Sequence, residues 1–440
     1  MLSIFRCYFF FLLSALVSPV TADPTLTVTP EKSSAIYDLG EKIIWDVKVS
    51  GDPAGTLKTA SYVLKKGGGT VIGQGTLTFP AGGATIIETS LTEPGTILAE
   101  VTTSSVADKK GIRALGGAAV AYDKIPRSAP CPADFDAFWK SKLDELATIP
   151  ANPVLEKGDS GRPGIDYWKI TLDNVNGTHI RGQLARPSGD KKAPAMLIVQ
   201  WAGVYPLDKN WALDRAAEGW LVLNIMAHDL PIDQPKDFYD KQSKNELKNY
   251  TAIGDTDRDK SYFLRMFLGD VQSAEYLTQR PDWDGKTLVV TGTSQGGLQS
   301  FATAALDPKI TAMLVLVPAG CDDSGALAGR KPGWPFYLSD VTSPEHAQIL
   351  QTSAYFDAVN FAARVKCPAL VALGLIDETA TPSAVFTAFN QLQGPREACV
   401  MPESEHQEHD GHTQAPYAVR SAAWRKALLA GNPLSIPANR

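Results

Sequence analysis

The sequence predicts a small all-β domain followed by an α/β domain with a mainly parallel sheet. Over residues 23 to about 122, short runs of alternating apolar residues are separated by glycine and proline clusters at intervals of about ten residues. From residue 134 onward, continuous apolar runs alternate with helical patterns. Strands that are buried on both faces have such runs, and their alternation with helices indicates a parallel sheet covered on both sides.

The first 22 residues have the pattern of a signal peptide. Arg6 precedes an apolar run from Cys7 to Val17, and small residues occupy the last and third-last positions before the expected cleavage after Ala22. The run is shorter than the roughly 18 apolar residues that a membrane-spanning helix needs. We therefore expect export to a secreted or periplasmic location, without a membrane span.

The composition and net charge of the chain argue against some classes of binding partner. The chain has 440 residues, 44% of them hydrophobic and 20% charged, as in ordinary globular proteins. A formal net charge of -6 argues against nucleic acid and anionic membranes as partners, because both attract concentrated Lys and Arg. Removal of the signal peptide leaves four cysteines, which we expect to be free thiols because a domain of this size needs no disulfides. These are Cys131, Cys321, Cys367 and Cys399.

The all-β part is expected to be an immunoglobulin-like sandwich over residues 23–122. Its expected strands are 43–49, 59–64, 70–79, 85–91, 97–103 and 118–122. It contains no catalytic constellation. Two roles stay open, a carbohydrate-binding or docking module and a structural appendage that packs on the catalytic domain.

The second part is expected to be the catalytic domain, over residues 134–440, after a linker at 123–133. Three prolines in the linker disfavour both helix and strand. Asp134 is placed to cap a helix whose apolar residues recur at helical spacing. The expected strands that follow are 167–172, 180–185, 195–201, 220–226, 287–291, 310–317, 369–375 and 398–401.

A motif for nucleophilic catalysis lies at the end of one of these strands. The strand pattern 287–291 runs directly into Gly-Thr-Ser-Gln-Gly-Gly at 292–297, and a helical pattern follows. This is the arrangement of a nucleophile elbow, in which small residues permit a sharp turn that lifts the serine hydroxyl above the sheet. A phosphate-binding turn is the alternative, but the spacing and lysine of a P-loop are missing. We predict Ser294 as the nucleophile.

An acid and a histidine follow the serine in the order of the α/β-hydrolase fold, each on a loop after a strand. Asp377 follows the strand pattern 369–375, and His406 follows the strand that ends at Met401. A serine hydroxyl is a poor nucleophile at neutral pH, so a histidine must take its proton and a carboxylate must orient that histidine. We predict His406 as the general base and Asp377 as the orienting acid.

The loop around His406 leaves alternatives open. His409 and His412 crowd the same loop, and His406 is preferred because it is nearest the strand end. The acidic residues and histidines of 403–412 could also be read as a metal site, but their irregular spacing matches no standard ligand set. We expect a solvated acidic loop and no metal.

These motifs resemble the acetyl xylan esterase and cephalosporin-C deacetylase family of carbohydrate esterases, over roughly residues 130 to 430. The likeness is strongest in Tyr-Phe-Asp-Ala-Val-Asn-Phe-Ala-Ala-Arg at 355–364, and it continues through Gly-Leu-Ile-Asp at 374–377. The segment Thr-Ser-Gln-Gly-Gly at 293–297 fits the family's elbow. The resemblance implies the α/β-hydrolase fold and assigns the triad roles to Ser294, Asp377 and His406.

The resemblance also implies the donors of an oxyanion hole, the backbone amides of Gln295 and Val204. Tyr205 is the near alternative to Val204. Two departures from the family concern substrate range more than reaction type. The chain reads Ala227-His228-Asp229 where the family has Arg-Gly-Gln, and His406-Gln407 where the family has His-Glu. The tripeptide Arg181-Gly182-Gln183 lies in an earlier strand and is taken as coincidence.

The function expected from the residues and the resemblance is removal of acetyl groups from O-acetylated sugars or xylo-oligosaccharides, with no cofactor. The segments 229–259 and 333–337 are expected to wall the pocket, where Trp334 and Tyr337 either stack on sugars or pack a lid. Other readings are an exported esterase or peptidase with another acyl substrate, and a non-catalytic sugar-binding protein. Homo-oligomer formation is compatible with the sequence, which does not specify it.

Overall fold

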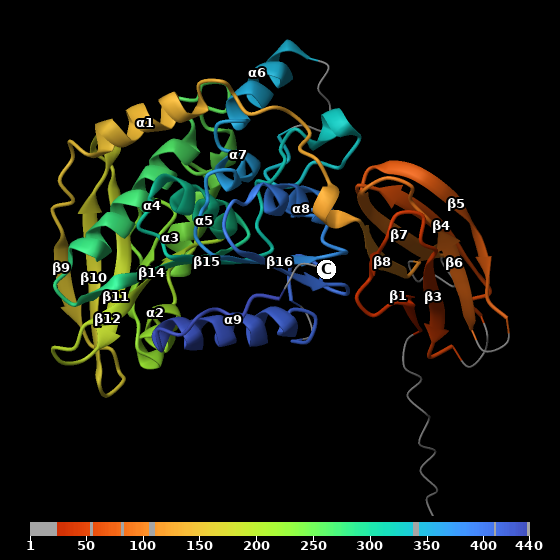
Figure 1. Cartoon of the computed structure of the whole chain (residues 1–440), viewed down its shortest axis with the longest axis horizontal. Helices are drawn as coiled ribbons and strands as arrows, with labels where there is room; N and C mark the ends of the chain where they lie inside the picture. The colour runs from red at the N-terminus through yellow and green to blue at the C-terminus, as the bar shows by residue number, and fades with distance from the viewer. Residues whose placement is uncertain are drawn as a thin grey trace, which may run out of the picture.

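The computed structural model describes residues 24–52, 56–80, 83–104, 111–337, 343–408 and 411–437. A β-sandwich lies beside a nine-stranded sheet that carries helices on both faces (Figure 1). The predicted fold class is confirmed, since an all-β part precedes an α/β part with a mainly parallel sheet. The expected signal peptide, with Cys7, lies outside the described residues.

The sandwich packs a sheet of order β1-β3-β6 against one of order β2-β8-β7-β4-β5. Its strands are β1 (Thr25–Pro30), β2 (Ile36–Tyr37), β3 (Ile43–Ser50), β4 (Thr59–Lys66), β5 (Thr70–Thr78), β6 (Ala84–Thr89), β7 (Gly95–Thr103) and β8 (Arg113–Val120). Strands β3 to β8 overlap the six expected ones, although β8 begins five residues earlier than expected, and β1 and β2 were missed. Trp45 on β3 is fully buried between the sheets and anchors their shared core.

The large sheet has the order β17-β16-β15-β14-β12-β13-β11-β10-β9. Strands β12 to β17 pair in parallel, and β9, β10 and β11 continue the sheet as antiparallel strands. The strands are β9 (Val154–Gly158), β10 (Ile165–Asp173), β11 (His179–Pro187), β12 (Ala193–Val199), β13 (Leu221–Ile225), β14 (Trp283–Thr293), β15 (Ala312–Leu316), β16 (Ala369–Gly374) and β17 (Arg396–Met401). The exposed strand β9 was not expected.

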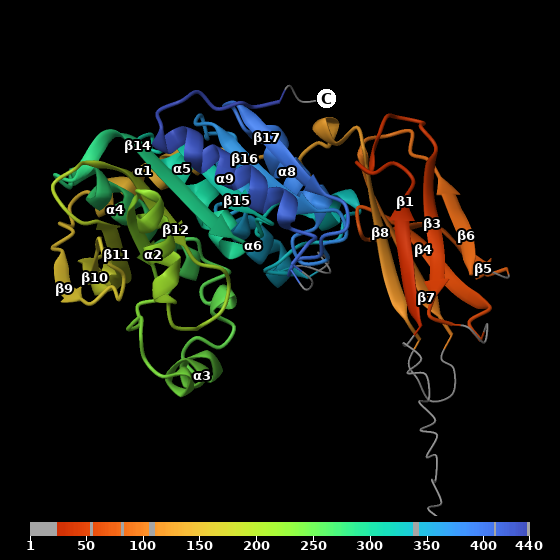
Figure 2. The same ribbon diagram turned by 90° about the horizontal axis from the view of Figure 1, so that it is seen from below.

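Helices cover both faces of this sheet (Figure 1 and Figure 2). One face carries α1 (Phe135–Leu146), α4 (Tyr262–Gln279), α5 (Gln295–Leu306), α7 (Ala358–Ala362) and α8 (Pro382–Gln391), and the other carries α2 (Lys209–Glu218) and α9 (Ala415–Leu429). Strands such as β13 and β16 are buried along their whole length, because apolar side chains on both pleat faces meet helices. α3 (Lys236–Lys244) projects away from the sheet, and α6 (Pro344–Ser353) lies above it.

The segment between the two parts is docked on the α/β part. Arg127 donates to Asn360, and the Ser128 hydroxyl donates to Asp322 at 2.6 Å. Arg330 forms an ion pair with the same aspartate and also donates to the carbonyl of Pro126. Polar contacts thus fix this segment on the α/β part.

The sandwich packs directly against the loop that carries Asp377. Gly117 on β8 lies against Leu375, so close that a Cβ added to the glycine would stand 2.4 Å from the Cβ of Leu375. Arg113, also on β8, forms an ion pair with Glu378 at 2.9 Å. This contact favours the structural role left open above, because the sandwich supports the backbone on both sides of Asp377.

The four cysteines of the described residues are free thiols, and Cys321 is buried. Burial raises the pKa of the Cys367 thiol to about 12 and that of Cys399 to about 11, so both are protonated and behave as small apolar groups. Across the described ranges, no helix has both the length and the apolar content to cross a membrane.

We predict that Gly117→Ala destabilises the protein by about 1 to 3 kcal/mol, because its methyl group overlaps buried Leu375. Gly95→Ala is the matched control on a neighbouring sandwich strand, since its Cβ would meet its nearest neighbour at 3.6 Å, an ordinary contact. Thermal unfolding of both variants measures the difference. Equal melting temperatures would show that the contact with Leu375 is loose.

Candidate active site

Ser294 occupies a strained turn between β14 and α5. Its φ and ψ are 56° and -119°, a backbone conformation that residues other than glycine rarely adopt. The neighbouring strand β15 holds the turn on one side, because the backbone amide of Ser294 donates to the carbonyl of Leu316, the last residue of β15, at 2.9 Å. The elbow predicted from the sequence is therefore present as a backbone geometry, and it presents the hydroxyl at the carboxyl end of the sheet.

The glycines of the elbow are required by close backbone contacts. A Cβ on Gly292 would stand 2.3 Å from the carbonyl oxygen of Gly296, and one on Gly296 would stand 2.6 Å from that of Val199. Real Cβ atoms do not approach so closely. The second contact also presses the elbow against the end of β12, which brings the loop that begins at Gln200 next to Ser294.

Three side chains meet above the strand ends. His406 Nε2 lies 2.8 Å from Ser294 Oγ, and His406 Nδ1 lies 2.8 Å from Asp377 Oδ2. The carboxylate can only accept, so Nδ1 carries a proton, and Nε2 of the neutral ring is then free to accept from the serine. The arrangement can take the proton of Ser294 when the oxygen attacks an electrophile.

Asp377 is buried and held in place by backbone donors. Its second oxygen, Oδ1, accepts hydrogen bonds from the amides of Thr379 at 2.7 Å and Ala380 at 2.8 Å. These donors stabilise the charged carboxylate and fix its direction. The free oxygen is thereby aimed at His406.

Parallel pairing explains why residues so distant in sequence meet. β16 and β17 are neighbours, with Gly374 opposite Met401, and the acid and the histidine lie on the loops that follow them. Gly374 also contacts the loop of His406, where a Cβ would stand 2.1 Å from the carbonyl oxygen of Ser404. The carboxyl ends of parallel strands share one edge of the sheet, so the three loops converge there.

The two expected oxyanion donors lie on the segments that flank the elbow. Gln295 is the first residue of α5, and Val204 lies on the loop after β12. Among the described residues, neither amide donates to a protein acceptor. Tyr205, the alternative, lies on the same loop, and its hydroxyl donates to the carbonyl of Trp201 at 2.9 Å.

Sequence reasoning missed the role of Tyr250, which comes from the polar excursion after β13. Its hydroxyl donates to Oε1 of Gln295, and its ring packs edge-on against His228, with 4.8 Å between the ring centres. Burial raises the pKa of Tyr250, so the phenol stays protonated as a donor. Since no motif surrounds this tyrosine, only its place in the fold reveals it.

The aromatic loop at 333–337 serves mainly for packing. Trp334 is half-buried against Phe263, and the Tyr337 hydroxyl donates to the carbonyl of Thr251 at 3.0 Å. Burial holds the pKa of Tyr337 well above its usual range. This geometry favours the packing alternative that the sequence left open for both residues.

No group of three or more metal-ligating side chains of a suitable arrangement occurs among the described residues. In the loop after His406, Glu408 accepts from the amide of Gln414 at 2.6 Å and from Thr413, which joins the loop to the start of α9. His409, the alternative base, lies outside the described residues.

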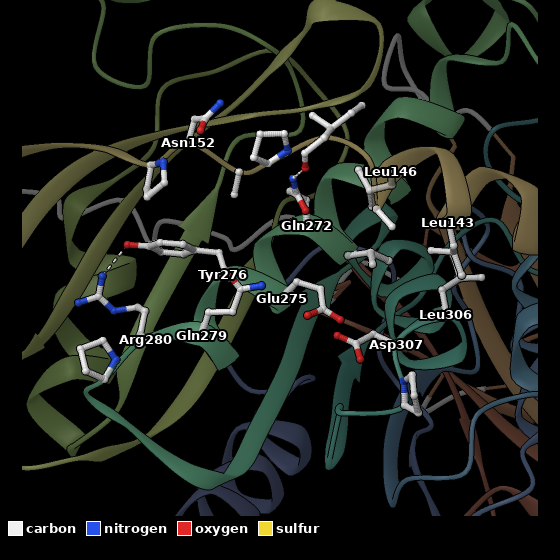
Figure 3. A pocket seen from close by; sticks show the side chains of 18 residues that line it. Leu143, Leu146, Asn152, Gln272, Glu275, Tyr276, Gln279, Arg280, Leu306 and Asp307 are labelled. Carbon is white, nitrogen blue, oxygen red and sulfur yellow. Dashed lines mark hydrogen bonds between the residues drawn. The ribbon is translucent and has the colours of Figure 1, made fainter.

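A pocket of about 830 Å³ lies away from the triad, between the end of α1 and α4. Figure 3 shows the residues that line it. They include Tyr276 on α4, Arg280 directly after α4 and Asp307 directly after α5. None of the triad residues lines it. The pocket is therefore separate from Ser294, Asp377 and His406.

Residues 123–424 match the family model described as acetyl xylan esterase (AXE1). The acetyl esterase Axe7A of Xylanibacter ruminicola is 33% identical over 281 residues, which are 62% of this chain and 63% of that relative. The chain thus spans less than two thirds of the length of this relative.

Two solved structures share the architecture. Acetyl xylan esterase 1 from Thermoanaerobacterium sp. JW/SL YS485 matches 70% of this chain and 97% of its own, with a TM-score of 0.61 and 25% identity. The acetyl xylan esterase from Paenibacillus sp. R4 matches 68% of this chain and 98% of its own, with a TM-score of 0.59 and 23% identity. The matches confirm the α/β-hydrolase fold and the family resemblance predicted from the sequence.

We predict that Ser294→Ala folds normally and lowers the turnover of 4-nitrophenyl acetate by up to about a millionfold, because the nucleophile is lost. Asp377→Asn should cost on the order of ten-thousandfold, because the amide no longer fixes the productive tautomer of His406. Glu378→Gln, next to the acid but directed at Arg113, is the matched control. Residual activity within tenfold of the parent for either triad variant would contradict the assignment.

Proposed function

The chain belongs to the acetyl xylan esterase family, and on that premise we propose that it is a serine esterase that removes acetyl groups from O-acetylated sugars or xylo-oligosaccharides. The observation that carries the proposal is the continuous hydrogen-bonded line from Asp377 through His406 to Ser294. A sugar-binding protein without activity would have no use for a strained serine held in such a line.

The proposed reaction has two stages. Ser294 Oγ attacks the acetyl carbonyl while its proton passes to His406 Nε2, and the oxyanion is stabilised by the amides of Gln295 and Val204. The histidine then protonates the leaving sugar alkoxide, which leaves an acetyl ester on the serine. Water, deprotonated by the same histidine, attacks this ester, and the histidine returns the proton to Ser294 Oγ as the acyl bond breaks and acetate leaves.

An aromatic surface beside the oxyanion loop supports a sugar as the alcohol part of the substrate. Trp201 is 39% exposed, and its ring stacks on Tyr205, with 5.1 Å between ring centres and 20° between planes. Trp211 of α2 packs edge-on against Trp201 at 4.8 Å. Such a braced, exposed indole offers an apolar face to a sugar ring at little cost in side-chain entropy.

We also propose that the protein acts outside the cytoplasm, secreted or in the periplasm. This rests on the sequence of residues 1–22 alone.

We predict a preference for acetate as the acyl group, because the chain belongs to the acetyl xylan esterase family and a pocket fitted to one methyl group rejects longer chains by overlap. Initial rates should fall at least about tenfold from 4-nitrophenyl acetate to butyrate and again to octanoate. Peracetylated xylose and acetylated xylan should release acetate. Octanoate hydrolysis at the rate of acetate, with no acetate from either sugar, would exclude the carbohydrate esterase while leaving a serine esterase.

We predict that Trp201→Ala raises KM for acetylated xylo-oligosaccharides by about tenfold, the loss expected when an aromatic contact of about 1.4 kcal/mol is removed. KM for 4-nitrophenyl acetate, which has no sugar, should stay within about twofold. Leu155→Ala, which removes an exposed apolar side chain on the edge strand β9, is the control. Equal changes in KM for both substrates would contradict a sugar contact at Trp201.

A further inference from the structure

His228 stands where the family resemblance leads one to expect Arg-Gly-Gln, and the triad does not use it. It follows β13 and is only 2% exposed. Its Nδ1 lies 2.7 Å from the hydroxyl of Tyr262, and its Nε2 lies 3.0 Å from the carbonyl oxygen of Gly203. We infer that His228 is a positioning residue that orients the amide of Val204 toward the oxyanion, acting through the carbonyl of Gly203.

The protonation of His228 follows from its partners. Burial lowers the pKa of the ring to about 4, so at neutral pH the imidazole is uncharged and carries one proton. The carbonyl oxygen of Gly203 can only accept, which places that proton on Nε2. Nδ1 is then an acceptor and accepts a hydrogen bond from the hydroxyl of Tyr262. The ring is thus a fixed donor aimed at the loop after β12.

The geometry of the peptide bond carries this hydrogen bond to Val204. The carbonyl of Gly203 and the N–H of Val204 belong to one planar trans peptide, in which the two bonds point in opposite directions. A donor that holds the oxygen on the His228 side therefore turns the N–H to the opposite side. There is no protein acceptor for this N–H among the described residues, which leaves it available to an oxyanion.

The rest of the loop holds the plane in place without competing for that N–H. Gly203 has a φ of +122°, which side chains rarely adopt, so the turn depends on glycine. The side chain of Val204 packs into an apolar cluster that includes Met226 and Tyr239. These contacts anchor the ends of the peptide unit, and His228 fixes its rotation.

The neighbours of His228 connect the two oxyanion donors. Tyr262 is the first residue of α4, and its hydroxyl accepts a hydrogen bond from Arg265, so that its own proton is directed to His228. Tyr250 packs against both His228 and Tyr262 and donates to the side chain of Gln295. One buried aromatic cluster therefore supports the loop of Val204 and the residue that supplies the other amide.

The inference rests on the proposed esterase function and predicts a defect in transition-state stabilisation. His228→Phe retains a buried ring but has no donor, and we expect kcat for 4-nitrophenyl acetate to fall about 10- to 100-fold with KM within about twofold. His228→Gln, whose amide nitrogen can donate, should recover part of the loss. Tyr262→Phe removes the hydroxyl that donates to Nδ1, so His228 can also protonate Nδ1 instead of Nε2. The kcat of this variant should lie between those of His228→Phe and His228→Gln.

Tyr276→Phe is the matched control for the tyrosine. It lies on the same helix, also accepts a hydrogen bond from an arginine, Arg280, and is about 21 Å along the helix from Tyr262. It should leave kcat unchanged. Thermal unfolding of all four variants separates loss of activity from loss of fold.

A substrate with sulfur in place of the carbonyl oxygen isolates the oxyanion contact. Sulfur is larger and a weaker hydrogen-bond acceptor than oxygen, so the wild type should hydrolyse the thionoester far more slowly than the ester. In His228→Phe, the ratio of the ester rate to the thionoester rate should be about tenfold smaller than in the wild type. An unchanged ratio and kcat in folded His228→Phe would overturn the inference. An inactive wild type would instead refute the proposed function.

A crystal structure of His228→Phe tests the geometry without turnover. A Gly203–Val204 peptide that is rotated or present in two orientations supports the inference. A peptide with the orientation seen here would overturn it even if the protein proved to have no esterase activity.

Discussion

The close approach of the elbow to the end of β12 is the constraint on which the site depends. Gly296 lies against the carbonyl oxygen of Val199, a contact that leaves no room for a side chain. It brings the first turn of α5 beside the loop that carries Val204, while the strained backbone of Ser294 lifts the hydroxyl between them. The side-chain Nε2 of Gln299 donates to the backbone carbonyl of Gln200 at 2.8 Å and keeps the two segments together.

Asp377 and His406 lie at the same edge of the sheet as Ser294, and other residues support the loops that carry them. Two backbone amides and the packed face of the sandwich hold the loop of Asp377. A buried aromatic cluster holds the opposite side of the site, through His228 on the Gly203 carbonyl and Tyr250 on Gln295. Both parts of the chain thus contribute contacts that support the proposed site, although Ser294, Asp377 and His406 all lie in the α/β part.

The support for the oxyanion loop also changes how the departure at 227–229 is understood. In sequence, Ala227-His228-Asp229 is a loss of the family's Arg-Gly-Gln. In space, His228 holds the oxyanion loop and Asp229 forms an ion pair with Arg181, a member of the tripeptide taken as coincidence. In this chain, His228, Asp229 and Arg181 thus make the contacts at this edge of the sheet where the family has Arg-Gly-Gln.

The sequence by itself determined the local features: the apolar strand runs, the glycines around Ser294 and the chain order of serine, acid and histidine. These depend on periodicity and on steric limits within a few residues, which a sequence pattern records. Strands β2 and β9 escaped because they are short or exposed and bury few apolar side chains, whereas β1 escaped although every second residue in it is buried. The tertiary structure decided the roles of Tyr250 and His228 and the contact of Gly117 with Leu375. Each of these depends on the meeting of segments between 25 and about 260 residues apart, and a hydrogen bond or a close contact across such a separation leaves no periodic trace in the chain.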